Sequence, residues 1–138
     1  IPGMGAAVDP QSKILMEKIM ALLEKTPLTP PNESDLLSEL RIDQKQGRQL
    51  LGYLRRNEEI IKANPEIHYS HAALKDIELK IVKGFESKAE LTASELKDIL
   101  GAISRKWAIP LFELLDKRHV TIRRGNVRTL HPSRQPSN

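Results

Sequence analysis

Apolar side chains recur at helical spacing through most of the chain and mark six amphipathic stretches. Each stretch follows a residue that commonly caps a helix N-terminus, and several end at proline or glycine. The predicted caps and the apolar residues that follow them are Asp9 with Leu15, Ile19, Leu22 and Leu23; Asn32 with Leu36, Leu37 and Leu40; Asp43 with Leu50, Leu51 and Leu54; Ser70 with Leu74, Ile77, Ile81 and Phe85; Thr92 with Leu96, Ile99 and Leu100; and Ser104 with Trp107, Leu111, Leu114 and Leu115. The pattern predicts six helices.

Two further segments have the short apolar runs and turn residues of β-hairpins. The first spans residues 60–69 around Asn64-Pro65, and the second spans residues 120–130 around Gly125-Asn126. Each predicted hairpin follows the third of three helices. The order helix–helix–helix–hairpin therefore occurs twice.

The two copies also align in sequence. Ser34 and Ser94 begin similar segments 60 positions apart (94 − 34), and Leu50 and Leu111 lie 61 positions apart (111 − 50). We interpret this as an internal duplication of a unit of about 60 residues. Because three helices and a terminal hairpin are typical of a winged helix, the sequence predicts a mostly α, α+β fold of tandem winged-helix domains. We expect one domain at residues 9–70 and the other at residues 71–131.

The ends of the chain differ from the repeats. The chain begins at Ile1 rather than Met, which suggests a piece of a longer protein, and we interpret residues 1–8 as a cloning remnant or a linker. Residues 132–138 are polar and are predicted to form a flexible tail. A length of 138 residues fits two small domains but excludes a TIM barrel or a nucleotide-binding enzyme with a substrate domain.

Composition removes several function classes. The chain has no Cys, which excludes disulfides, cysteine zinc sites and thiol nucleophiles and is consistent with a cytoplasmic protein. No apolar run reaches the ~18–20 residues of a membrane span. Aromatic residues make up only 4% of the chain, too few for a base-stacking sheet. His68 and His71 lack an evident third metal ligand, and no phosphate-binding loop or catalytic motif is present. We expect no enzyme activity, metal or cofactor in this chain.

Charge is unevenly distributed along the sequence. The net charge of +4 divides into −2 over residues 1–102, with 14 basic and 16 acidic residues, and +6 over residues 103–138, with eight basic and two acidic residues. The positive excess therefore falls on the third helix and the hairpin, or wing, of the second repeat. These are the elements that a winged helix presents to nucleic acid.

The predicted wing holds one group of basic residues. Gly125 and Asn126 form a two-residue turn, for which glycine in the first position favours type II′, and this register places Arg123 opposite Arg128. Like charges at opposed positions destabilise a strand pair by up to about 1 kcal/mol. We therefore interpret these arginines, together with Arg124, as a phosphate-binding group from which folding gains nothing. The alternative is a solvated hairpin tip with tolerated repulsion.

The start of the last predicted helix holds the second group. Arg105 and Lys106 follow the cap Ser104, where cations oppose the helix dipole. Together with the free N–H groups of the helix start, they suit a phosphate or a base edge. The alternative is two solvated side chains. Trp107 is suited to base stacking or to the core, and its i+4 spacing to Leu111 favours the core.

Residues 91–130 resemble a known family. The run Ser104-Arg-Lys-Trp-Ala-Ile-Pro-Leu111, followed by Arg123-Arg-Gly-Asn-Val-Arg128, resembles the last winged helix of SelB, the bacterial selenocysteine-specific elongation factor. Residues 9–70 resemble the preceding winged helix in pattern only. In that family an N-terminal GTPase carries selenocysteinyl-tRNA, and C-terminal winged helices bind the selenocysteine insertion (SECIS) hairpin of the mRNA.

The resemblance implies a fragment without the GTPase, with an mRNA stem-loop as its partner and, in the full-length factor, the ribosome. It also implies that the first domain orients the last one, where the expected RNA-binding residues lie: Ser104, Arg105, Lys106, Trp107, Arg118, Arg123, Arg124, Gly125, Asn126 and Arg128. We expect a cytoplasmic monomer. Two other functions stay open: a DNA-binding winged-helix regulator and a tandem winged-helix scaffold that binds protein.

Overall fold

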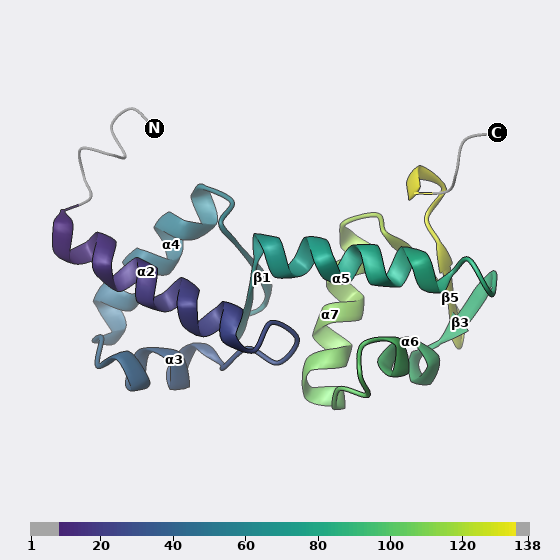
Figure 1. Ribbon diagram of the computed structural model, residues 1–138, viewed down its shortest axis with the longest axis horizontal. Coiled ribbons are helices and arrows are strands. Elements are labelled where there is room, and N and C mark those ends of the chain that lie inside the picture. Colours follow the sequence, from purple (N-terminus) through teal and green to yellow (C-terminus); the bar gives the residue numbers. More distant parts are fainter. Residues whose placement is uncertain (1–8, 135–138) are drawn as a thin grey trace. The chain divides into compact units, whose positions relative to one another are not determined.

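The computed structural model describes residues 9–134, and its elements are labelled as in Figure 1, starting at α2. The chain divides after His71 into two compact units. The first contains α2 (Pro10–Lys25), α3 (Glu33–Leu40), α4 (Gln44–Arg56), β1 (Ile60–Asn64) and β2 (Ile67–Ser70). The second is built from α5 (His71–Gly84), β3 (Glu90–Thr92), α6 (Ala93–Ile99), α7 (Arg105–Lys117), β4 (Thr121–Arg124), β5 (Val127–Leu130) and the 3-10 helix η1 (Pro132–Arg134). The predicted order of helices and hairpins, and the α+β winged-helix fold, are confirmed.

Short polar side chains fix where several helices begin. A side-chain oxygen of Asp9, Asn32 and Asp43 accepts a hydrogen bond from the backbone N–H three residues further on, at 2.6, 2.8 and 2.7 Å respectively. Thr92 and Glu95 form a reciprocal capping box at the start of α6. These bonds satisfy N–H groups that have no partner within the helix. Because the signal is local, the sequence predicts these helix starts correctly.

The core of the first unit lies between its three helices and its hairpin. Ile19 and Leu23 of α2, Leu51 of α4 and Ile60 of β1 are each at most 2% exposed. Met16 is also buried, whereas the predicted Leu15 only packs against the core from its edge. The buried face of α2 is therefore rotated slightly from the predicted one, and the thioether side chain of Met16 fills the place in the core predicted for Leu15.

The second unit contains a strand that the sequence did not reveal. β3 pairs antiparallel with β5, with Leu91 opposite Arg128, and gives a three-stranded sheet in the order β3-β5-β4. Three residues, the last of which is the Thr92 cap, are too few for an alternating pattern to be visible. The apolar core residues of this unit that are at most 1% exposed are Leu74, Ile77, Ile81, Leu96, Ala108, Leu111, Leu115 and Val120.

The backbone repeats the internal duplication. Arg41 and Ala102 both have positive φ, as do Glu58 and His119, with all four values between 57° and 60°. The members of each pair lie 61 positions apart (102 − 41 and 119 − 58). Few residues other than glycine adopt this conformation. Its recurrence at equivalent turns supports the duplication independently of side-chain similarity.

The prediction of a flexible tail is wrong for residues 132–134. They form η1, and Arg134 Nη1 lies 3.2 Å from Oε1 of Glu78, a residue of α5 that is only 2% exposed. A buried carboxylate needs charged or hydrogen-bonding partners, so this ion pair holds the segment against its unit. The predictions made for residues 1–8 and 135–138 lie outside the described residues.

Two glycines of α4 offer a matched test of packing in the first unit. A Cβ on Gly47 would overlap Leu37 Cδ1 and Cδ2, whereas one on Gly52 would meet only flexible arginine ends, the nearer being Arg56 Nη1 at 3.3 Å. We expect Gly47→Ala to lower the free energy of unfolding by about 1–2 kcal/mol through overpacking. Gly52→Ala should leave it unchanged or raise it by up to about 1 kcal/mol, because alanine favours a helix interior. Equal effects in urea unfolding would contradict the packing of α3 against α4.

Candidate nucleic-acid interface

The first turn of α7 presents the basic residues predicted there. Arg105 and Lys106 are exposed, and the side chain of the N-cap residue Ser104 makes no capping hydrogen bond. Asp43, at the equivalent position before α4, does make one. The start of α7 therefore combines two cations, a hydroxyl not used as a cap and the N–H groups of a helix start. This combination suits an anionic oxygen.

Trp107 is half-buried, so it lies between the two alternatives of a core position and an exposed base-stacking position. Lys106 Nζ lies 4.9 Å from the centroid of its ring, which is a cation–π contact. The indole therefore supports the Lys106 side chain beside the helix start. Only the part of the ring that stays exposed is available to a base.

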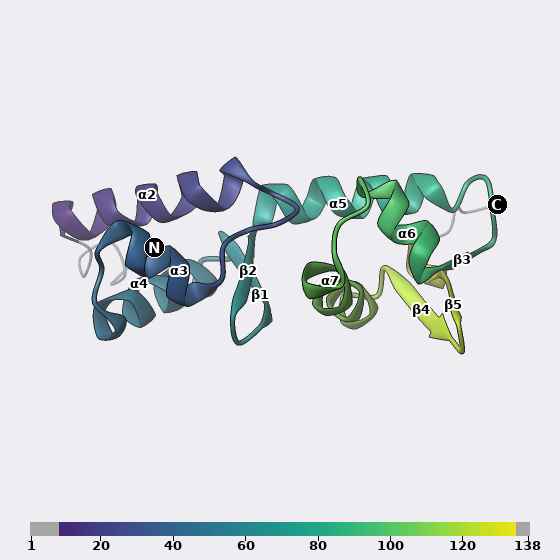
Figure 2. The same ribbon diagram turned by 90° about the horizontal axis from the view of Figure 1, so that it is seen from below.

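The β4–β5 hairpin, or wing, has the predicted register and turn. Arg123 pairs with Arg128, and Gly125 has a φ of +65° while Asn126 is not among the residues with positive φ. A positive φ at the first turn position alone is the type II′ geometry. Figure 2 shows the tip of this hairpin and α7 on the side of the second unit opposite α5.

Two arginines extend from the wing beside its turn. Arg123 and Arg124 are exposed, as are Gly125 and Asn126. Arg123 Nε donates to the Gly125 carbonyl at 3.3 Å, and Arg124 Nε donates to Thr129 Oγ1 at 3.4 Å. These long, exposed hydrogen bonds orient the two guanidinium groups without neutralising them, so both stay suited to phosphate.

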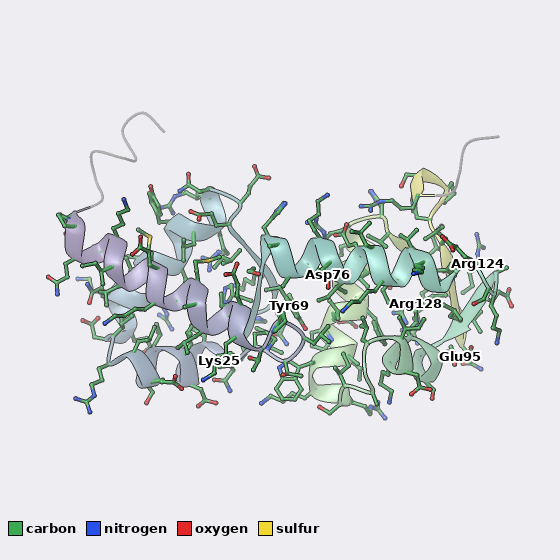
Figure 3. The ribbon with its side chains drawn as sticks, in the orientation of Figure 1. Lys25, Tyr69, Asp76, Glu95, Arg124 and Arg128 are labelled. Carbon is green, nitrogen blue, oxygen red and sulfur yellow. The ribbon has the colours of Figure 1, made fainter. Side chains whose placement is uncertain are left out.

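Arg128 has the predicted strand position, but its side chain has a partner within the protein. It is 9% exposed and turns toward α7, where its Nε lies 3.1 and 3.2 Å from the two Asp116 carboxylate oxygens and its Nη2 lies 3.0 Å from Oδ2. Its guanidinium carbon also lies 5.6 Å from the centroid of the Phe112 ring. In Figure 3, Arg124 lies at the outer edge of the unit, and Arg128 lies closer to α7. The interpretation that folding gains nothing from Arg128 is therefore wrong, because Asp116 compensates its charge.

Arg118 is also paired within the protein. Its Nε lies 2.7 Å from Oε2 of Glu78, the same buried carboxylate that Arg134 contacts through Oε1. One carboxylate thus holds an arginine from the end of α7 and another from η1. Arg118 therefore has a structural partner in Glu78, and its RNA contact stays a prediction.

The remaining predicted cations define one candidate surface. Arg105, Lys106, Arg123 and Arg124 are exposed and form no ion pair with any residue between 9 and 134. We call these four residues the α7–wing surface. The other predicted binding residues that stay accessible, wholly or in part, lie in the same two segments: Ser104, Trp107, Gly125 and Asn126.

The equivalent surface of the first unit has less positive charge. Asp43 occupies the helix start, and the hairpin tip reads Lys62-Ala-Asn-Pro65 where the wing has two adjacent arginines before its turn. The pairing of β1 with β2 also shifts register between Lys62 and Asn64. At the offset of 61, the first unit has lysines in place of Lys106 and Arg123, namely Lys45 and Lys62, but uncharged Gln44 and Ala63 in place of Arg105 and Arg124.

A buried histidine in the first unit was missed as a structural residue by sequence reasoning. His68 is 1% exposed, and its Nε2 lies 3.2 Å from Arg55 Nη1. Burial, and then the positive charges of Arg55 and Lys62, lower the pKa of His68 to about 4, so its neutral ring accepts from Arg55 at pH 7. Arg55 precedes Asp116 by 61 positions and His68 precedes Arg128 by 60 (116 − 55 and 128 − 68). Both units therefore join helix and hairpin through the same two positions, and aligning the repeats would have revealed this.

Neither a metal site nor a membrane-spanning helix is found in the described part of the chain. Between residues 9 and 134, no three His, Asp or Glu side chains are grouped so that they could hold a metal ion. Among the helices of that same range, none has both the length and the apolar character needed to cross a membrane.

Three helices and a hairpin, twice in succession, define a tandem winged-helix protein. The mRNA-binding domain of elongation factor SelB from E. coli, solved in complex with SECIS RNA, has the same fold. It matches with a TM-score of 0.74 at 21% identity, over 90% of this chain and 99% of that chain. The bacterial selenocysteine-specific elongation factor EF-Sec matches with a TM-score of 0.69 at 22% identity, over 90% of this chain and 20% of that chain.

Sequence comparison relates part of the second unit to a known family. Residues 84–130 match the family described as elongation factor SelB, winged helix. The selenocysteine-specific elongation factor of Desulfomicrobium baculatum is 32% identical over 103 residues, which are 75% of this chain and 16% of that protein. Residues 84–130 therefore belong to the SelB winged-helix family, and the chain spans about one sixth of the length of this relative.

Proposed function

We propose that this chain is the RNA-binding C-terminal part of a selenocysteine-specific elongation factor and recognises a SECIS hairpin in mRNA through its last winged helix. One observation carries the proposal: the α7–wing surface places four exposed cations on the helix and hairpin by which winged helices contact nucleic acid. The E. coli SelB domain of the same fold was solved with SECIS RNA, which supports RNA rather than DNA as the ligand.

The chemistry of the surface suggests how its two parts share the task. Arg123 and Arg124 neutralise backbone phosphates and set the position of the stem. The start of α7, with Arg105, Lys106 and the Ser104 hydroxyl, reaches the adjoining loop or a bulged base. Sequence-specific RNA recognition generally reads such unstacked bases, because the deep major groove of an A-form stem is closed to side chains.

The proposal also covers the setting of this module. Binding of this kind needs no catalytic residue and no cofactor. We expect a monomer, because the duplication already supplies two units in one chain, and we expect it to act in the cytoplasm, on the ribosome within the full-length factor. The first unit, with fewer cations at its equivalent surface, serves to orient the second.

A pair of substitutions on the wing tests the proposal. We expect Arg123→Ala with Arg124→Ala to weaken binding of an RNA hairpin by about ten- to a hundredfold and to lower the slope of log K against log salt by about 2, because two phosphate contacts are lost. The probe is a stem-loop enriched on the unaltered chain from a pool with randomised loop and bulge sequences. Electrophoretic titration at several salt concentrations measures both quantities.

Two comparisons make this test specific. Lys18→Ala with Lys25→Ala removes two exposed cations from α2 and should leave RNA affinity nearly unchanged. A DNA duplex of equal length should bind more weakly than the hairpin. Equal affinity for the duplex would instead favour a DNA-binding regulator. No measurable RNA binding, with retained binding to a protein partner, would favour a scaffold.

A further inference from the structure

We propose that Asp116 and Arg128 are positioning residues for RNA binding. In this inference, which rests on the proposed function above, their ion pair fixes the direction of the wing relative to α7. Arg123 and Arg124 then reach the same RNA that the start of α7 contacts. We call the contact between Asp116 and Arg128 the wing tie.

The wing tie and one further hydrogen bond, from Thr121, connect both strands of the hairpin to one carboxylate of α7. Arg128 of β5 contacts both Asp116 oxygens at 3.0–3.2 Å, and Thr121 of β4 donates its hydroxyl to Asp116 Oδ1 at 2.5 Å. The Arg128 and Asp116 side chains are 10% and 26% exposed, so solvent screens the pair only partly. A bidentate arginine–carboxylate contact restricts orientation as well as distance. It therefore specifies an angle between helix and hairpin.

The tie lies next to the cations whose position it sets. Arg128 is paired directly with Arg123, and Arg124 is the next residue along β4. Without the tie, a nearby fixed contact of the hairpin to α7 is the hydrogen bond from the Val120 N–H to the Leu115 carbonyl, at 2.9 Å. Val120 lies four residues before Arg124 (124 − 120), about 13 Å of strand at ~3.3 Å per residue. β3 also supports the hairpin, through the pairing of Thr92 with Val127. The tie therefore sets the tilt of this sheet toward α7 rather than holding the hairpin alone.

The tie also separates the roles of two opposed arginines. Asp116 compensates the charge of Arg128, and the Nε and Nη2 donors of Arg128 are used within the protein. Arg123 consequently faces a neutralised partner across the strand pair and stays exposed. Of two cations that the register brings together, one orients the wing and the other is left for the ligand.

The first unit shows the same joint with less restrictive chemistry. There the helix residue Arg55 donates a hydrogen bond from Nη1 to Nε2 of the strand residue His68, at 3.2 Å. The corresponding hairpin tip carries Lys62 in place of the two arginines. The orientation-specific ion pair therefore occurs in the unit whose hairpin carries the proposed binding residues, as expected if its purpose is alignment.

A double-mutant cycle tests the inference on the full chain, with the enriched RNA hairpin as the probe. Arg128→Met keeps an apolar stem against Phe112 but removes the tie. With the wing arginines present, we expect it to weaken RNA binding by about 5–30-fold and to lower the salt slope by about 1–2, although Arg128 itself contacts no phosphate. In the Arg123→Ala/Arg124→Ala background, the same change should cost less than about twofold.

Two further variants serve as controls for this double-mutant cycle. Arg118→Met removes an equal charge and also breaks an ion pair, that with Glu78, but should show no coupling to the wing arginines. Asp116→Asn provides a second way to weaken the tie, and all titrations are made where circular dichroism shows the variants folded. Equal losses from Arg128→Met in both backgrounds, no loss at all, or the same coupling with Arg118→Met would overturn the inference. Failure of the proposed function is distinguishable, because the wing variant alone would then leave RNA binding unchanged.

Discussion

Arg128→Ala is expected to lower the free energy of unfolding of the second unit by about 3 kcal/mol, far more than an arginine on a solvated hairpin would. The substitution leaves the Asp116 carboxylate with the Thr121 hydroxyl as its remaining partner. Breaking a buried ion pair by removing one member costs about 3–5 kcal/mol. The 26% exposure of the Asp116 side chain places our expectation at the lower end of that range. Trp107, the single tryptophan of the chain, makes fluorescence a specific monitor of this unit in urea.

Arg123→Ala is the control for this prediction. It removes the same charge from the opposite strand position, but its side chain is exposed and forms no ion pair within residues 9–134. We expect its melting temperature to stay close to that of the unaltered chain. From the sequence alone, both arginines were predicted to be dispensable for folding. Identical unfolding curves for the two variants would contradict the wing tie.

The first unit should lose about 3 kcal/mol of stability through His68 as the pH falls from 6.5 to 4. The pKa of His68 is about 4 in the folded chain, chiefly because of burial and also because Arg55 and Lys62 disfavour the cation. The unfolded side chain has a pKa of about 6.5. Between these values the unfolded state binds more protons than the folded state, so stability is complete above pH 6.5 and declines as the pH falls through this window.

Variants of two neighbouring histidines isolate this contribution. His68→Gln retains a neutral acceptor for Arg55 but does not titrate, so its stability should depend less on pH over the same range. His71→Gln, at an exposed position, should preserve the full dependence. Urea unfolding followed through the methyl signals of Ile19 and Leu51 reports on the first unit. Parallel pH dependences for His68→Gln and the unaltered chain would show that His68 is not held neutral by folding.

The fold was predictable because its main determinants are local. Caps such as Asp9 and Thr92 lie within three residues of the N–H groups that they satisfy, and the apolar spacing of each helix is visible in a short window. The strand β3 was missed because its determinant is not local. β3 is three residues long and is defined by its pairing with β5, which lies far from it in sequence.

The candidate site was only partly predictable, because sequence locates charges but not their partners. The exposed cations Arg123 and Arg124 were found from the charge distribution and the hairpin register. The partner of Arg128 lies 12 positions away on α7, and that of Arg118 lies 40 positions away on α5. Such pairings depend on tertiary packing. They decide which arginines of a basic segment are structural and which are left for a ligand.

The two helix–hairpin joints constrain the order in which the duplicated units diverged. One unit has arginine on the helix and histidine on the strand, Arg55 and His68, and the other has Asp116 and Arg128. A mutational path between them with one replacement at a time passes through arginine facing arginine, or through aspartate facing histidine. The arginine–arginine intermediate places two like charges together at a largely buried position. The aspartate–histidine intermediate is a favourable pair, whether the imidazole is neutral or protonated. An ancestor with the Arg–His joint would thus have accepted the helix replacement first, and an ancestor with the Asp–Arg joint the strand replacement first.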